Sequence, residues 1–246
     1  QHTEHRIRST AAMIFPVMMR GGLDANGGAG IAQSLKVRLI HSTIRNLILR
    51  GAPPDALQAC LSALPPLAQP AAKPTLYQTL FARGWNVADS GLPCNQEELA
   101  YTLLTFSHVF LRSLQRLGIG LARADEEAYL HAWNVVGHVL GIERGLMADT
   151  MEQAASLFAQ LQARGRSQAV APDPRPALGA ALMQTMARSI PWPVTQPVPV
   201  LLTRHLCGRE TAHDLGLDRR VPLAASALFW AMLLLARGID TLVRWW

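Results

Sequence analysis

Residues 31–50 read IAQSLKVRLIHSTIRNLILR. Apolar side chains recur in this stretch at intervals of three and four residues, Val37 and Ile44 among them, which is the period of an α-helix. Gly51 and the two prolines shortly after it are typical of a helix end. The pattern predicts an amphipathic helix, and it places His41 on the apolar stripe of that helix.

The helical period recurs along the rest of the chain, and no convincing alternation of polar and apolar residues predicts a strand. Asn95 followed by Glu98 has the spacing of a capping box, which predicts a helix from there to Gly118. Further helices are expected at 125–140, 149–164, 177–189, 199–208, 209–216 and 221–244. Loops or flexible connectors are expected at 21–30, 52–75 and 190–200. The predicted fold class is therefore all-α.

The most apolar part of the chain is a hydrophobic helical tail, residues 218–246, which follows a first domain at 1–217. Sixteen uncharged residues separate Arg220 from Arg237, fewer than the roughly 20 that a bilayer span needs. Two interpretations stay open for this tail. It is either a terminal helix packed on the core or a membrane-associated helix with interfacial tryptophans.

Charge and cysteine content exclude several classes of protein. The chain carries 23 Lys+Arg against 17 Asp+Glu, a net charge of +6, but its basic residues are scattered singly. Because no basic run interleaved with aromatic residues occurs, nucleic acid is not an expected partner. Three cysteines are too few for a disulfide framework, which favours a cytoplasmic or membrane-associated protein over a secreted one.

Common metal and nucleotide motifs are absent from the sequence. His131 and His138 are seven residues apart, about 10.5 Å of helix rise, which is too far for both imidazoles to bind one ion. A di-iron bundle needs two Glu-x-x-His motifs, and the chain has one, from Glu210 to His213. No Rossmann fingerprint, phosphate loop or nucleophile elbow is present.

His41 is different, because it stands alone within an apolar stripe. Such a residue is either a core histidine satisfied by hydrogen bonds or one axial ligand to a flat apolar cofactor such as haem. Haem needs a single imidazole, where zinc needs three or four protein ligands. Arg38 and Arg45, with the pair Arg6 and Thr10, would supply the polar part of such a site.

Five sequence blocks occur in order along the chain. They are Arg6-x-x-x-Thr10, Lys36-Val-Arg-x-x-His41-x-x-x-Arg45, Gly91-Leu-Pro-Cys-Asn-Gln-Glu-Glu-Leu, Thr105-Phe-Ser, and Glu127-Ala-Tyr-Leu-His131-Ala-Trp-Asn-Val-Val-Gly137-His-Val-Leu-Gly141. Together they resemble the rubber oxygenase (latex clearing protein) and mpaB-type oxygenase family over about residues 6–165. A weaker match follows at 201–217.

The resemblance implies a single all-helical domain that binds haem b, with His41 as the proximal ligand of the iron. It also implies that Arg6 and Thr10 match a haem-pocket motif. We expect these two residues to act in catalysis, and Arg38 and Arg45 to bind the cofactor together with His41. The implied reaction uses O2 on an apolar, isoprenoid-like or lipid-like substrate that contains an alkene, with oxidative cleavage of the double bond as the family's chemistry.

Three departures from the family pattern accompany this resemblance. Ser9 stands where the rubber-cleaving enzymes have a lysine. Their proposed catalytic glutamate lies upstream of Arg6, where no counterpart can be placed, and the family's N-terminal helical portion is expected to be missing. His131 and Trp133 belong to the family's helix pattern, and we interpret them as packing residues.

Two other functions remain open at this stage. One is a helical haem-binding or lipid-binding protein without turnover, associated with membranes through its C-terminal tail. The other is a structural helical domain without a cofactor.

Overall fold

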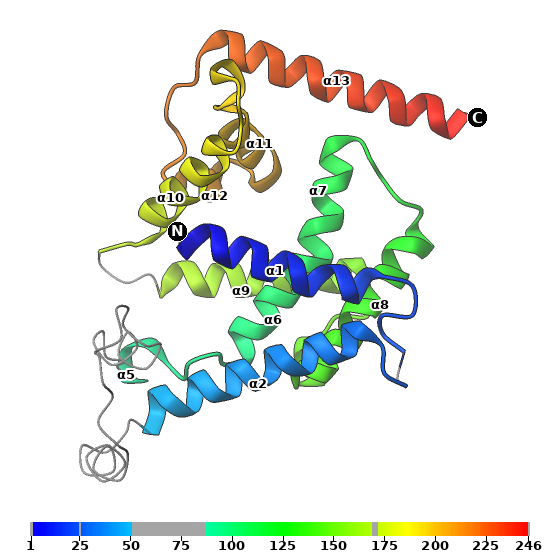
Figure 1. Cartoon of the computed structure of the whole chain (residues 1–246), viewed down its shortest axis with the longest axis vertical. Coiled ribbons are helices and arrows are strands. Elements are labelled where there is room, and N and C mark those ends of the chain that lie inside the picture. Colours follow the sequence, from blue (N-terminus) through cyan, green and yellow to red (C-terminus); the bar gives the residue numbers. More distant parts are fainter. Residues whose placement is uncertain (1, 25, 51–86, 169–171, 246) are drawn as a thin grey trace, which may run out of the picture.

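The computed structural model describes residues 2–24, 26–50, 87–168 and 172–245 (Figure 1). These residues form helices and turns with no strand among them, which confirms the predicted all-α fold. The α-helices are α1 (His2–Met18), α2 (Ala29–Arg50), α5 (Val87–Ser90), α6 (Gln96–Leu104), α7 (Phe110–Leu117), α8 (Arg123–Leu140), α9 (Met151–Ser167), α10 (Arg175–Arg188), α11 (Val198–Cys207), α12 (Arg209–Asp214) and α13 (Leu223–Trp245). A π-helix, η1 (Thr105–Val109), and two 3-10 helices, η2 (Arg144–Leu146) and η3 (Pro193–Thr195), complete the set.

The predicted helix ends are confirmed where the sequence carries capping residues. The Asn95 side chain accepts the backbone N–H of Glu98 at 2.9 Å, and the Glu98 carboxylate accepts the backbone N–H of Asn95 at 3.2 Å. This reciprocal pair is the capping box that starts α6. Gly118 and Gly141 end α7 and α8 in the left-handed conformation, which glycine adopts without steric cost.

The main core lies where α6, η1, α8 and α9 meet. Trp133 of α8 is buried there and stacks on Phe106 of η1, with ring centroids 5.2 Å apart. Leu104 and Leu130 are buried in the same cluster. Helix α2, on which His41 lies, packs against α8 of this core. The core therefore supports the position of α2.

The glycine-rich stretch 21–30 is a tight turn, and the expectation of a flexible connector was wrong. The backbone N–H of Gly30 donates to the carbonyl oxygen of Gly22 at 2.7 Å. A Cβ added at Gly30 would lie 2.7 Å from the Cα of Val17, and one added at Gly22 would lie 2.0 Å from the carbonyl oxygen of Pro16. The glycines are needed because they let α1 and α2 approach backbone to backbone.

Other boundaries also differ from the sequence prediction. Helix α1 was not predicted, and the helix expected from Asn95 to Gly118 contains the π-helix η1 at its centre. The stretch 190–200 includes η3 and the start of α11, because proline is tolerated in the first turn of a helix. The loop expected at 52–75 lies outside the described residues.

Candidate functional site

Two arginines attach α2 to neighbouring parts of the fold. Arg38 donates from Nη1 to the carbonyl oxygen of Val139 at 3.0 Å, in the last turn of α8. Arg45 donates from Nε to the carbonyl oxygen of Pro93 at 3.0 Å, and from Nη2 to that of Cys94. The two attachments fix both the rotation and the axial position of α2.

His41 lies between these two attachments in the sequence, three residues after Arg38 and four before Arg45. Residues at such spacing share one side of a helix, so His41 is on the side of α2 that faces the fold. Its side chain is half-buried. Burial lowers the pKa of His41 below its ordinary value, and the positive charge of Arg45 lowers that pKa further. The imidazole is therefore held neutral, the form whose ring nitrogen can bind a metal.

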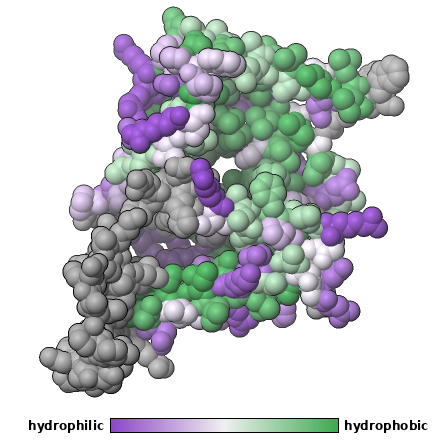
Figure 2. All heavy atoms as spheres, viewed as in Figure 1, coloured by the Kyte–Doolittle hydropathy of each residue, from purple (hydrophilic) through white to green (hydrophobic). Residues whose placement is uncertain are grey.

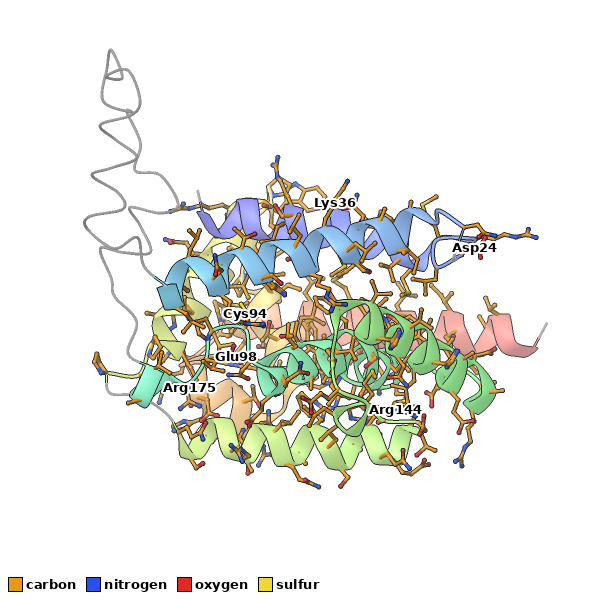
Figure 3. All side chains as sticks on the ribbon, turned by 90° about the horizontal axis from the view of Figure 1, so that it is seen from below. Asp24, Lys36, Cys94, Glu98, Arg144 and Arg175 are labelled. Carbon is orange, nitrogen blue, oxygen red and sulfur yellow. The ribbon has the colours of Figure 1, made fainter. Side chains whose placement is uncertain are left out.

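The loop before α6 carries an unusual backbone conformation next to this site. Cys94 has a φ of 51°, the one non-glycine residue with positive φ in the described part of the chain. Its carbonyl oxygen accepts from Arg45, and Figure 3 shows Cys94 on the α6 side of α2. Burial, followed by the charge of Glu98, raises the pKa of the Cys94 thiol, so the thiol stays protonated. The strained loop serves to present a carbonyl oxygen to Arg45.

Gln96 connects the same loop to the end of α8. Its side-chain Nε2 donates to the carbonyl oxygen of Gly141, and its Oε1 accepts the backbone N–H of Glu143, both at 2.9 Å. The end of α8 also accepts the hydrogen bond from Arg38. Helix α2, the loop before α6 and the end of α8 therefore form one connected frame around His41, which we call the α2 frame.

Arg6 and Thr10 both lie on α1, the helix that faces α2 across the glycine turn. Thr10 is exposed, and the side chain of Arg6 lies outside the described residues. Position along the helices can still be compared, because Val17 and Gly30 are in backbone contact. Arg6 is eleven residues before Val17 and His41 is eleven after Gly30, so each lies about 16.5 Å along its helix from that contact. The two residues are therefore at the same distance from the turn, and Figure 1 shows the helices diverging from it.

Potential ligands for a bare metal ion do not gather in the described part of the chain. No group of three or more His, Cys, Asp or Glu side chains is found there that could hold an ion. His131 and His138 are both exposed on α8. The packing role expected for His131 was thus wrong, whereas that of Trp133 is confirmed by its burial. A single half-buried neutral imidazole fits haem, which takes one axial histidine, better than it fits zinc.

Sequence reasoning missed a buried histidine, His108 in the π-helix η1. Its ring packs on Phe158 of α9, with centroids 6.0 Å apart, and its Nδ1 has no hydrogen-bond partner among the described residues. Burial and the charge of Arg112 lower the pKa of His108. His108 lies on the buried side of this stretch, four residues after the buried Leu104 and three before the buried Leu111.

The family described as "ER-bound oxygenase mpaB/B'/Rubber oxygenase, catalytic domain" matches residues 1–238. The chain belongs to this oxygenase catalytic-domain family.

Two relatives of this mpaB and rubber oxygenase domain illustrate the relationship. The rubber oxygenase of Streptomyces sp. (strain K30) is 22% identical over 237 residues, covering 94% of this chain and 49% of the relative. A solved structure of the latex clearing protein in the closed state superposes with a TM-score of 0.62 at 20% identity, covering 89% of this chain and 50% of that one. The structural match shows a shared all-helical fold, and the chain spans about half the length of these relatives.

Proposed function

We propose that this domain belongs to a haem b oxygenase that uses O2 on an apolar substrate containing an alkene, of the isoprenoid or lipid class. Family membership supports an oxygenase. The observation that carries the haem assignment is the half-buried neutral imidazole of His41, held within the α2 frame, while the described residues contain no group of three or more potential metal ligands. Oxidative cleavage of the double bond is the reaction that the family resemblance suggests.

In this proposal His41 is the iron ligand. Its neutral ring nitrogen would bind the metal, and the frame would keep the ring from rotating with its helix. When bound, haem supplies the chemistry that activates O2 for oxidation of the substrate. Half-burial of His41 limits access of water to that side of the site.

Arg38 and Arg45 would bind the acidic groups of the cofactor through the N–H donors that are not used in hydrogen bonds within the α2 frame. A guanidinium has five N–H donors. Arg38 is seen to use one of them on Val139, and Arg45 two on Pro93 and Cys94. Each arginine could therefore hold α2 in place and still donate to a carboxylate.

Arg6 and Thr10 are the proposed catalytic residues on α1. Arg6 lies as far along α1 from the glycine turn as His41 lies along α2, and Thr10 would add a hydroxyl donor one helical turn further along. Ser9 precedes Thr10 and is exposed, in the position where the resemblance places a lysine in rubber-cleaving enzymes. The shorter side chain would leave the face opposite His41 more open to O2.

The direct test is an absorption spectrum in the Soret region of the natural full-length protein. We expect a Soret band in the purified or haem-supplemented protein, and its loss or a large shift in His41→Ala. The matched control is His131→Ala, because His131 is exposed on α8. Absence of haem from the wild-type protein, or an unchanged spectrum in His41→Ala, would refute the proposal.

A second candidate is a helical haem-binding or lipid-binding protein without turnover, favoured by the exposed apolar side chains of α13. Thr10→Ala separates the two functions. In an oxygenase this variant keeps its haem and loses O2 consumption with an alkene substrate. In a binding protein it changes neither. A protein that stays colourless after haem addition would point to the third alternative, a structural domain.

A further inference from the structure

Helix α13 packs on the rest of the molecule through a narrow strip. Ala225, Phe229 and Leu233 are buried, at intervals of four residues on one side of the helix. His205 of α11 packs edge-on against Phe229, with ring centroids 5.9 Å apart, and against Trp230 at 5.6 Å. In the segment Leu223–Val243 only 17% of the most apolar window is buried. Most of the helix surface therefore has no partner among the described residues.

The charged side chains of the segment Leu223–Val243 lie beside the buried strip rather than in the middle of the open surface. Leu223–Val243 contains two charged residues, Arg237 and Asp240. Arg237 crosses Gly118 and donates to the carbonyl oxygen of Arg116 at 2.9 Å, and Asp240 is half-buried. Both positions are near the buried strip on the helix circumference. The rest of the circumference of this segment therefore carries no charged side chain.

The open side of α13 is instead a continuous apolar surface (Figure 2). We call it the α13 apolar face, and its exposed large side chains are Leu223, Trp230, Met232, Leu234, Leu235, Ile239, Leu242 and Val243. Exposure on this scale along one helix indicates a partner that is itself apolar.

Aromatic and basic residues flank this face. Trp192, 69% exposed, directly precedes η3, which packs against α13, and Trp230 is 51% exposed on α13 itself. Arg219 and Arg220, just before α13, are exposed and make no ion pair among the described residues. Indoles at the rim and uncompensated arginines at one end are the features of a helix that binds a lipid surface.

Space for an anionic headgroup lies beside the two arginines. An open groove of about 630 Å³ is lined by Arg219 and Arg220 on one side and by small residues of α10, including Ala177, Ala180 and Ala181, on the other. Phosphate oxygens are strong acceptors for guanidinium donors. The groove therefore offers room for a phosphate group next to the start of the helix.

We propose that the α13 apolar face binds the surface of an anionic phospholipid bilayer, with the helix in the plane of the interface and Arg219 and Arg220 on lipid phosphates. A transmembrane orientation would place Arg237 and Asp240 in hydrocarbon and would detach Phe229 and Leu233 from the body, both of which are costly. A second copy of the chain brings the same uncompensated arginines, whereas anionic lipids neutralise them.

This inference does not depend on the proposed oxygenase function. No residue of α13 belongs to the α2 frame, so membrane binding and haem binding succeed or fail separately. If the protein is an oxygenase that acts on an apolar compound, α13 would hold it at the membrane, where such a compound dissolves.

Vesicle flotation tests the apolar face. We expect the full-length protein to float with vesicles of phosphatidylcholine and phosphatidylglycerol, and the double variant Leu234→Glu/Leu235→Glu to stay in solution. These residues are 67% and 66% exposed, so the fold should survive, which circular dichroism checks. The matched control is Leu39→Glu/Ile40→Glu on α2, at 68% and 54% exposure, which should still float.

A second variant tests the charge contribution. Arg219→Ala/Arg220→Ala should weaken partitioning onto the anionic vesicles by about fivefold per arginine, with little change on pure phosphatidylcholine. Equal binding to both kinds of vesicle, or no flotation of the wild-type protein, would overturn the proposal. So would a dimer in light scattering that Leu234→Glu/Leu235→Glu converts to monomer without any vesicle binding, since the face would then bind a second copy.

Discussion

The guanidinium of Arg38 donates to the carbonyl oxygen of Val139 across 3.0 Å, although 101 positions separate them in the sequence. The last carbonyl groups of a helix lack partners within the helix and carry partial negative charge. A cation there therefore satisfies an otherwise open acceptor of α8. Arg45 is bonded in the same way to the carbonyl oxygens of Pro93 and Cys94. The position of His41 therefore depends on all three parts of the α2 frame.

Arg45→Ala is expected to lower the free energy of unfolding by about 1–3 kcal/mol, because it leaves two half-buried carbonyl acceptors without their charged donor. Arg45→Lys should recover only part of the loss, since an ammonium does not reproduce the fork of donors. The control is Lys36→Ala on the same helix. Figure 3 shows Lys36 on the side away from Cys94, and its replacement should change little. Urea unfolding of the cofactor-free protein measures all three variants.

Gly30→Ala should weaken the α1–α2 contact. Its Cβ would meet the Cα of Val17 and the carbonyl oxygen of Gly22, each at 2.7 Å, and backbone atoms have little room to shift. We expect a loss of about 1–3 kcal/mol from overpacking. Haem binding should also weaken, because the contact between Gly30 and Val17 determines where Arg6 on α1 lies relative to His41 on α2. Thermal unfolding and haem titration check both effects.

Gly145→Ala is the control for that substitution. A Cβ at Gly145 would meet no atom within 4 Å, and its backbone conformation is one that alanine adopts. Stability should stay unchanged or rise by about 0.4–1 kcal/mol. If Gly30→Ala behaved like Gly145→Ala, the close approach of the two helices would not be a constraint.

Much of the fold follows from local signals in the sequence. The capping box at Asn95 and the glycine stops at Gly118 and Gly141 act within a few residues, so they predict helix ends correctly. The turn at 21–30 was misjudged, because the need for glycine there comes from Val17 and Pro16 on the neighbouring helix. Contacts between helices are not encoded in any local pattern.

The candidate site was only partly predictable, because local spacing gives the side of a helix on which a residue lies but not its partners on other helices. The position of His41 on one side of a helix follows from helical spacing. The carbonyl partners of Arg38 and Arg45 lie 101 and 48 or 49 positions away, and no spacing rule connects them. His108 lies at ordinary helical spacing from the buried Leu104 and Leu111, so its place on the core side was predictable, whereas the π-helix itself has no local sequence signal.

His108→Leu should stabilise the protein or leave its stability within about 1 kcal/mol. The substitution fills most of the same space and removes the ring nitrogen Nδ1, which is buried without a partner and therefore opposes folding. His108→Ala should instead cost about 2–4 kcal/mol, because it opens a cavity against Phe158. Differential scanning calorimetry distinguishes the two. A large loss of stability in His108→Leu would mean that Nδ1 is hydrogen-bonded in solution.

The free energy of unfolding of the cofactor-free protein should begin to decrease at a pH well above that at which carboxylates take up protons. The pKa values of His41 and His108 are both lowered in the folded chain, chiefly by burial. In the unfolded chain these imidazoles take up protons near pH 6.5. Below about that pH the unfolded state binds more protons than the folded state, so the stability that is fully present at higher pH decreases as the pH falls.

Urea unfolding as a function of pH tests this expectation. The midpoint should decrease as the pH falls from about 7.5 to about 5, and the decrease should become smaller in His41→Gln and smaller again when His108→Leu is added. His131→Gln is the matched control substitution, at an exposed histidine of α8. An identical profile in wild type and the His41→Gln/His108→Leu double variant would show that neither ring is held neutral by the fold.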